Sequence, residues 1–334
     1  MSRVLPALFK GAPRARPRHC SFTAITANPT RGPRHGSSFA GRTQLAKSNK
    51  LRQAFAENRP SMGVWQMLPG VNISRVLART PGVDWVMVDC EHGQMTGTSF
   101  PSEWFGVCRK YGSNWFLDAA MHEAVPVIAA TGTTPVVRIP DFQPWMIKRA
   151  LDSGAHGDQI LVPLIRTVEE VRSVVRSCKF PPEGNRGFGS PLSMENFSPV
   201  PSLTEYLEQA NDALLVMVQI ETKEALEAVD EIALLVDVLF IGPFDLGNNI
   251  GHPIINGVIE AELDAAIKRV LEAGNRAGKK CGIYCTSAEM ARKYAEMGFS
   301  MMSAAADYTG LQQHMAETLA IAHGKAQPQK GQSY

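Results

Sequence analysis

Residues 214–241 read LLVMVQIETKEALEAVDEIALLVDVLFI. Two continuous apolar runs, Leu214–Ile220 and Val236–Ile241, flank a helical pattern that opens with the cap-type residue Thr222. Continuous runs rich in Val, Ile and Leu are typical of parallel strands that are covered on both faces. The stretch therefore predicts a strand–helix–strand unit with two parallel strands.

Six further apolar runs of the same character alternate with helical patterns along the chain. They are Met62–Met67, Trp85–Asp89, Pro135–Ile139, Ile160–Ile165, Cys281–Cys285 and Phe299–Ala304. Eight strands that alternate with helices favour an α/β fold of the (β/α)₈ TIM-barrel type. The alternative is a doubly wound sheet, which normally carries a glycine fingerprint after its first strand. The turn that follows Met67, Leu68-Pro-Gly-Val-Asn72, lacks that pattern.

Local signals place several of the helices between these strands. Pro144–Leu151 is helical in pattern and ends at Ser153-Gly154, which is a typical helix stop. Thr167 and Glu170 have the spacing of a capping box. The stretch Glu260–Gly278 is long and amphipathic, and we expect a helix there.

The first 50 residues differ from the rest of the chain. Residues 1–56 hold eight Arg, three Lys and no acidic residue, which leaves 23 basic against 32 acidic residues in the remainder. An N-terminus that is poor in acids and rich in Arg and Ser is typical of a mitochondrial transit peptide. The alternative is a disordered extension or an overlong gene model. We expect a basic extension over residues 1–50, a barrel over 51–325 and a short tail over 326–334. The expected location is cytoplasmic or mitochondrial.

Composition excludes several classes of protein. A nucleic-acid binder would carry its positive charge on the folded part, which here is acidic. No apolar run approaches the roughly 18 residues that a membrane-spanning helix needs. The six Cys residues lack the close pairs of a zinc ribbon or a redox motif, so we interpret them as ordinary thiols in a reducing compartment.

Polar residues at the carboxyl ends of the predicted strands are the candidates for catalysis. In a TIM barrel the loops that follow the strands converge at one face, where the active site lies. The candidates at these strand ends are Asp89, His92, Arg138, Gln219, Glu221 and Asp245.

Glu221 and Asp245 lie at two neighbouring strand ends and suit a hard cation. Mg²⁺ and Mn²⁺ are commonly held by one or two carboxylates, with water and substrate oxygens completing the shell. A 2-oxo acid offers its carboxylate and keto oxygens to such an ion. The structural alternative is that Glu221 caps the following helix and Asp245 makes a turn.

His92 and Arg138 suggest proton transfer and anion binding. His92 can accept a proton near neutral pH, and either Asp89 or Asp152 could orient its imidazole. Arg138 lies on an otherwise apolar strand and needs an anionic partner, such as an enolate or a carboxylate. The structural alternative for Arg138 is a buried ion pair with Asp152.

These residues belong to six ordered segments that carry a family resemblance. The segments are WVMVDCEHG (85–93), TPVVRIP (134–140), IKRALDSGAHG (147–157), PPEGNRGFG (181–189), VQIET (218–222) and FIGPFDL (240–246). They resemble the HpcH/HpaI aldolase family of the phosphoenolpyruvate/pyruvate barrel superfamily. The resemblance runs from about Leu51 to the C-terminus.

The resemblance implies a class II retro-aldol reaction in which a 4-hydroxy-2-oxo acid is cleaved to pyruvate and an aldehyde. It implies a divalent cation (Mg²⁺, Mn²⁺ or Co²⁺) on Glu221 and Asp245, and His92 as the base. It also implies that Arg138 stabilises the enolate and that Asp152 raises the basicity of His92.

Further implications of the resemblance concern substrate binding and assembly. Gln219 and the backbone at Phe244 would hold the pyruvate part of the substrate. A homo-oligomer is implied as well, typically a hexamer built from dimers that exchange a C-terminal helix, here around Leu311–His323.

The sequence departs from the family at two places. Phe244 replaces a residue that is commonly Ala, which predicts a narrower or shifted pyruvate pocket. His92 and Arg138 are also separated by more positions than usual, and the surplus lies in residues 94–117. We interpret this stretch as an insertion in a loop of the barrel, either a lid or a retained intron in the gene model.

Two other functions remain open from the sequence. A CoA-ester lyase of the citrate or malyl type would use the same barrel and metal site, but it needs a basic surface for the nucleotide phosphates, and no clear basic cluster lies near the strand ends. A non-catalytic barrel blocked by the insertion is the other alternative, although all the motif residues are present.

Overall fold

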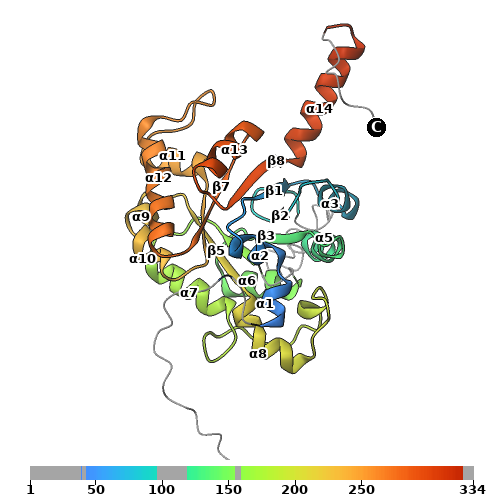
Figure 1. Cartoon of the computed structure of the whole chain (residues 1–334), viewed down its shortest axis with the longest axis vertical. Helices are drawn as coiled ribbons and strands as arrows, with labels where there is room; N and C mark the ends of the chain where they lie inside the picture. The colour runs from blue at the N-terminus through green and yellow to red at the C-terminus, as the bar shows by residue number, and fades with distance from the viewer. Residues whose placement is uncertain (1–38, 40–42, 96–118, 155–158, 326–334) are drawn as a thin grey trace, which may run out of the picture. The chain divides into compact units, whose positions relative to one another are not determined.

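The computed structural model describes Phe39 and residues 43–95, 119–154 and 159–325. Its eight strands form a closed parallel barrel in the order of the chain (Figure 1). The strands are β1 (Ser61–Gln66), β2 (Trp85–Asp89), β3 (Thr134–Arg138), β4 (Gln159–Val162), β5 (Leu215–Ile220), β6 (Val238–Ile241), β7 (Lys280–Tyr284) and β8 (Met301–Ala306). The predicted TIM barrel and all eight predicted strands are confirmed, with ends that differ by a few residues.

Helices follow the strands and cover the outside of the barrel (Figure 1). Among the described residues they are α1 (Gln44–Ser48), α2 (Lys50–Ala56), α3 (Val71–Ala78), α5 (Ala119–Ala130), α6 (Pro144–Asp152), α7 (Val168–Cys178), η1 (Leu192–Met194), α8 (Leu203–Ala213), α9 (Lys223–Glu227), α10 (Val229–Ala233), α11 (Pro243–Ile250), α12 (Ala261–Arg276), α13 (Ala288–Glu296) and α14 (Asp307–Ala322). None of the described helices is long and apolar enough to cross a bilayer.

The helix-capping residues that the sequence predicts form the expected hydrogen bonds. The Thr167 hydroxyl accepts the backbone N–H of Glu170, and the Glu170 carboxylate accepts that of Thr167, which completes the capping box of α7. The Thr222 hydroxyl caps α9 by accepting the N–H of Ala225. These caps mark the residues at which α7 and α9 begin, after the loops that follow β4 and β5.

The barrel has an apolar cluster in its interior and a separate apolar layer outside. Interior-facing residues of the strands form one apolar cluster, which includes Trp85, Met87, Val136, Met217 and Phe240. Their neighbours on the same strands point outward and pack against the helices in a second, larger cluster. Apolar packing on both faces explains why the strands read as continuous apolar runs.

Helix α2 covers the amino ends of the strands. Leu51 and Phe55 join the interior cluster, and the Arg52 guanidinium donates to the carbonyls of Ala213 and Leu214 at the start of β5. Helix α1 packs against α8 and buries Leu45. The last residues of the predicted extension are thus helical and packed against the barrel domain.

Three predicted segments lie largely or wholly outside the described residues. The basic extension is described only at Phe39 and from residue 43, the insertion only at Gln94 and Met95, and the tail not at all. The domain boundaries drawn from the sequence stay predictions. The last helix, α14, extends from β8, and most of its residues are exposed (Figure 1).

Candidate active site

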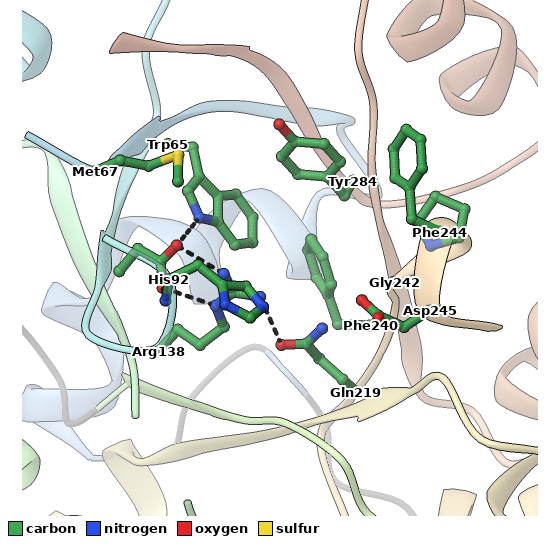
Figure 2. Close-up of a pocket in the computed structure, with 12 residues that line it drawn as sticks. Trp65, Met67, His92, Arg138, Gln219, Phe240, Gly242, Phe244, Asp245 and Tyr284 are labelled. Carbon is green, nitrogen blue, oxygen red and sulfur yellow. Dashed lines mark hydrogen bonds and ion pairs between the residues drawn. The ribbon is translucent and has the colours of Figure 1, made fainter. Parts of the chain in front are cut away.

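A cavity of about 230 Å³ opens at the carboxyl ends of the strands (Figure 2). Its lining comes from β1, β2, β3, β5, β6 and β7 and the loops that follow them: Trp65, Met67, Asp89, His92, Arg138, Gln219, Phe240, Gly242, Pro243, Phe244, Asp245 and Tyr284. The structure thus brings most of the predicted site residues to one place.

A buried ion pair between Asp89 and Arg138 forms one wall of the cavity. The Arg138 Nε and Nη2 atoms donate to the two Asp89 oxygens at 3.0 and 2.6 Å. Burial raises the pKa of Asp89, but the bonds and charge of Arg138 outweigh it and the pKa is lowered overall. Burial likewise lowers the pKa of Arg138, and Asp89 reverses that effect. Both groups are therefore ionised, and Arg138 pairs with Asp89 rather than with Asp152.

Trp65 fixes this pair from the side of β1. Its indole N–H donates to Asp89 Oδ2 at 2.9 Å, and the Arg138 guanidinium carbon lies 4.9 Å from the centre of its ring. The sequence analysis did not identify Trp65 as a site residue. The available signal was a Trp near the carboxyl end of the first predicted strand.

Asp89 also orders the loop that carries His92. The backbone N–H groups of Glu91 and His92 donate to Asp89 Oδ1 at 3.0 and 3.1 Å. The His92 side chain is 61% exposed, so its imidazole can reach a substrate at the mouth of the cavity. Asp89 positions His92 through the backbone rather than through its ring.

Glu91 is a second site residue that the sequence analysis missed. Its Oε2 atom lies 3.0 Å from Arg138 Nη1, and its Oε1 atom lies 3.8 Å from the His92 Nε2 atom. The signal was present in the motif Asp89-Cys-Glu-His92, where Glu91 stands between two residues that were assigned roles.

Gln219 lines the opposite wall at the end of β5, and the buried Glu221 carboxylate is bonded to it. The Gln219 amide donates to Glu221 Oε2 at 2.6 Å, and the Leu164 N–H donates to Glu221 Oε1 at 2.6 Å. The Gln219 carbonyl accepts from Arg138 at 3.4 Å (Figure 2). A Cβ atom at Gly242 would lie 2.5 Å from Glu221 Oε2, so a side chain at this position would have to displace the carboxylate.

Asp245 enters the cavity from the first turn of α11. The helix begins at Pro243 directly after Gly242, and a proline is well suited to a first helical position. Figure 2 shows the Asp245 carboxylate beside Gly242 on the Gln219 side of the cavity. The helix start that follows β6 thus places an acidic side chain beside the end of β5.

The carboxylates in this region repel one another. The pKa of Glu221 is raised to about 7, mainly by burial and in part by the charges of Glu91 and Asp245, while the hydrogen bond from Leu164 and the charge of Arg138 act in the opposite direction. Burial and the nearby Asp89 and Asp245 also raise the pKa of Glu91. The charge of Arg138 lowers the pKa of Glu221 but does not outweigh burial and the neighbouring carboxylates.

The residues present fit a divalent cation. Glu221 is 2% exposed and makes no ion pair with a described residue, and Asp245, whose charge raises the pKa of Glu221, brings a second carboxylate to the cavity. Hard oxygen donors in this arrangement suit Mg²⁺, Mn²⁺ or Co²⁺. Glu221 and Asp245 would hold the ion and the remaining positions would be open to substrate and water.

Asp152 lies apart from this group. Its Oδ1 atom accepts from Arg186 Nη2 at 3.2 Å, and the Arg186 guanidinium stacks over Phe180 at 4.6 Å. Within the described part of the chain, Asp152 makes no contact with His92 and does not line the cavity. Its role toward His92 stays a prediction from the resemblance.

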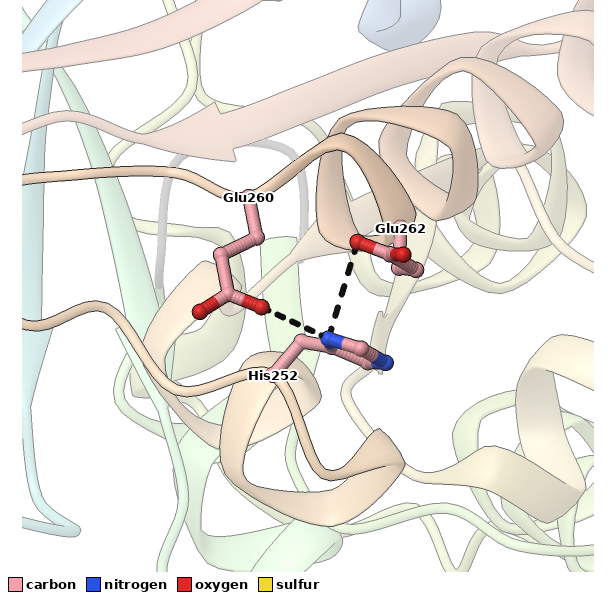
Figure 3. Close-up of side chains that lie close together, drawn as sticks. All are labelled: His252, Glu260 and Glu262. Carbon is pink, nitrogen blue, oxygen red and sulfur yellow. Dashed lines mark hydrogen bonds and ion pairs between the residues drawn. The ribbon is translucent and has the colours of Figure 1, made fainter.

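Another group of possible metal ligands lies outside the cavity. His252, Glu260 and Glu262 offer ligand atoms within 4.8 Å of one another, the one such group of three found among the described residues (Figure 3). The His252 Nδ1 atom lies 2.8 Å from Glu260 and 3.6 Å from Glu262. The two glutamates are more than half exposed, and the imidazole–carboxylate contacts account for the arrangement without a metal ion.

Comparison with known proteins agrees with this geometry. Residues 117–313 match the family model of HpcH/HpaI aldolase/citrate lyase. The chain is 31% identical to a hydroxypyruvate/pyruvate aldolase of Roseovarius nubinhibens over 82% of its own length and 97% of that protein. It is 33% identical to a 4-hydroxy-2-oxo-heptane-1,7-dioate aldolase of Klebsiella pneumoniae over 78% of its own length and 89% of that protein.

The solved structures give the same result. A HpcH/HpaI aldolase/citrate lyase family protein from Burkholderia cenocepacia superimposes with a TM-score of 0.68 at 29% identity, over 82% of this chain and 99% of that one. The barrel, the order of the strand-end residues and the similarity over most of the chain lead to one conclusion. The chain belongs to the HpcH/HpaI aldolase/citrate lyase family and is a carbon–carbon lyase of the class II pyruvate aldolase type.

Proposed function

We propose that the protein cleaves a 4-hydroxy-2-oxo acid to pyruvate and an aldehyde with the help of a divalent cation. The observation that carries this proposal is one cavity lined by the Asp245 carboxylate and a fixed cation, Arg138, with the buried Glu221 carboxylate bonded to the lining residue Gln219. The names of the two aldolase relatives support the choice of a pyruvate-type product.

The proposed cleavage needs one base and a group that stabilises an enolate, and the cavity offers candidates for both. A base removes the proton of the C4 hydroxyl, the C3–C4 bond breaks, and the C4 carbon leaves as an aldehyde. The bonding electrons pass to the enolate of pyruvate, which takes up a proton at C3. His92 is the base in this proposal because its exposed imidazole is held at the mouth of the cavity by Asp89.

Arg138 would stabilise the negative charge that develops on the enolate. Its guanidinium is held by Asp89 and Trp65 before the substrate arrives, so little reorganisation is needed in the transition state. Gln219 and the backbone at Phe244 would orient the pyruvate part. A divalent cation on Glu221 and Asp245 would supply Lewis-acid polarisation of the keto oxygen.

The test is a panel of 4-hydroxy-2-oxo acids offered to protein that has been stripped with EDTA. Pyruvate release is followed with lactate dehydrogenase and NADH after addition of Mg²⁺, Mn²⁺ or Co²⁺. We expect release that depends on the metal and is abolished in Glu221→Gln. A lack of pyruvate release with every substrate and metal would overturn the proposal.

Malyl-CoA and citramalyl-CoA belong in the same assay as a comparison. Arg138 is the single permanently charged cation among the described residues that line the cavity, and it is already paired with Asp89. The cavity thus shows no basic cluster for nucleotide phosphates. Cleavage of the CoA esters in preference to the free acids would assign the protein to the other branch of its family.

We also propose a homo-oligomer in which α14 makes contacts between subunits. Exposed apolar residues along this helix support the proposal: Tyr308, Leu311, Met315, Leu319 and Ile321. Light scattering coupled to size exclusion should give the mass of a hexamer, whereas an active monomer would contradict the proposed assembly.

A further inference from the structure

Four aromatic side chains form a continuous series along one side of the cavity. Phe240 lies deepest and is fully buried, with its ring centre 5.8 Å from that of Trp65. Tyr284 meets Trp65 edge to face at 5.1 Å, and Phe244 meets Tyr284 at 6.4 Å. Phe244 is 39% exposed and therefore forms the outer end of the series.

The outer two rings of this series, Tyr284 and Phe244, lie across the cavity from Arg138 and Gln219. Figure 2 shows Tyr284 and Phe244 along one edge, with Arg138 and Gln219 on the opposite edge. If the 2-oxo acid part is bound between Arg138 and the carboxylates Glu221 and Asp245, the rest of the substrate extends toward the mouth. The side chain of the aldehyde half then contacts the Phe244 and Tyr284 rings.

The charge around the cavity is unfavourable for a second substrate carboxylate. The lining includes the carboxylates of Asp89 and Asp245, and the Glu91 carboxylate contacts the lining residue Arg138. The charge of a divalent cation on Glu221 and Asp245 would be taken up by the 2-oxo acid part of the substrate. The one permanent cation among the described lining residues, Arg138, already pairs with Asp89 and Glu91. An anionic group near Phe244 would thus lack a cation among these residues.

From these two observations we propose that Phe244 and Tyr284 determine the aldehyde specificity and select a neutral aldehyde with an apolar chain over an aldehyde that carries a carboxylate. The inference rests on the proposed aldolase function and deepens it. Burying a hydrocarbon chain against aromatic rings is favourable, whereas burying an unpaired carboxylate there is costly.

The proposed preference for an apolar aldehyde concerns the step in which the carbon–carbon bond forms or breaks. In the synthetic direction the methyl group of pyruvate loses a proton to the base, and the resulting carbon attacks the carbonyl carbon of the aldehyde. The aldehyde oxygen takes up the proton. Only the substituent of the aldehyde differs between substrates, so a difference in kcat/KM reports the contacts of that substituent in the transition state.

The experiment compares pentanal with 4-oxobutanoate, which have similar chain lengths and differ in charge. Pyruvate is the donor, Mn²⁺ is present, and product formation is followed by mass spectrometry. The rate of deuterium exchange into the methyl group of pyruvate, measured without aldehyde, normalises each variant. We expect the wild-type kcat/KM to favour pentanal at least tenfold.

Two variants at Phe244 and one control test the residue directly. Phe244→Ala removes the outer ring and should lower the preference for pentanal about tenfold. Phe244→Lys places a cation at the rim and should shift the preference toward 4-oxobutanoate. Leu234, which is 59% exposed at the amino end of β6, provides the control, and Leu234→Ala should keep the wild-type preference.

The possible outcomes separate the two proposals. If pyruvate exchanges its methyl protons but 4-oxobutanoate reacts as well as pentanal, the specificity inference is wrong and the aldolase proposal stands. If exchange is absent with every metal, the aldolase proposal fails and the inference fails with it. A preference that persists unchanged in both Phe244 variants would also overturn the assigned role of this residue.

Discussion

The interior of the barrel and its mouth are built from the same strands but have opposite chemistry. On three strands the interior-facing side chain changes from apolar to polar over two residues: Met87 to Asp89, Val136 to Arg138 and Met217 to Gln219. Alternate residues of a strand point to the same face, so each pair belongs to adjacent layers of one interior. The lower layer contributes packing and the upper layer contributes charge.

This contrast shows how the fold tolerates a cluster of buried charges. The lower layer consists of packed apolar side chains, while the charged layer is held together by hydrogen bonds from Trp65, Gln219 and the backbone of Leu164. Changes in the lower layer should therefore affect stability, and changes in the upper layer should affect catalysis.

Substitutions of Gly63 in the apolar layer and of Gly242 at the mouth should have the largest effects and so test the difference between the two layers most strongly. A Cβ atom at Gly63, in the interior, would lie 2.0 Å from the Trp85 ring, which is fully buried and cannot move. Such overpacking typically costs about 1–3 kcal/mol and occasionally more. We expect Gly63→Ala to lower the melting temperature by roughly 10 °C or to prevent folding.

Gly242→Ala is the matched change at the mouth. Its Cβ atom would lie 2.5 Å from Glu221 Oε2 and should displace that carboxylate, which would lower aldolase activity roughly 100-fold. Thermal melts and pyruvate release measured on both variants give the comparison. A Gly242→Ala protein that unfolds like Gly63→Ala would show that the two layers are not separable.

Arg138→Ala should lower kcat by roughly 100-fold, because the guanidinium stabilises charge that develops in the transition state. The substitution also leaves the fully buried Asp89 without its partner, so stability should fall as well. Kinetics must therefore be measured well below the melting temperature of the variant. A variant that changes KM alone would refute the assigned role of Arg138.

The raised pKa of Glu221 predicts a pH dependence of stability in the metal-free protein. The folded pKa of about 7 exceeds the ordinary value of 4.5, so the folded protein holds a proton that the unfolded chain loses. Stability should fall as the pH rises from about 4.5 through 7, by roughly 3 kcal/mol in total from this group.

Urea unfolding in EDTA at several pH values between 5 and 8 measures this effect. The difference in unfolding free energy between the wild type and Glu221→Gln should change over that range, because the glutamine does not titrate. Mn²⁺ should restore the stability of the wild type at pH 8. A difference that is constant with pH would mean that Glu221 is already compensated in the metal-free protein.

The smallest effect on stability is expected from the predicted insertion. Closure entropy grows slowly with loop length, by about 0.6 kcal/mol per doubling, so the barrel should tolerate extra residues after β2. Deleting Thr96–Trp115 should leave the thermal melt nearly unchanged and preserve or raise activity. Loss of folding on deletion would show that the segment is an integrated part of the barrel.

The sequence predicted the strands and the positions of most site residues well. Continuous apolar runs and capping residues are local features, and parallel strands of a barrel must bring their carboxyl ends together. Asp89, His92, Arg138, Gln219 and Asp245 could therefore be placed at one cavity before their contacts were known. The stretch of residues 214–241 alone indicates the repeating unit.

Only the tertiary structure decided how these residues pair. Arg138 could have paired with Asp152 according to the sequence, but β2 and β3 are adjacent and in register, so Asp89 lies directly opposite Arg138. Trp65 and Glu91 joined the site for a similar reason, since their contacts cross between strands or around a turn. The sequence indicates which face of a strand a side chain occupies, because side chains alternate between the two faces along the strand. Partners depend on strand register and on side-chain packing, which arise only when distant segments meet.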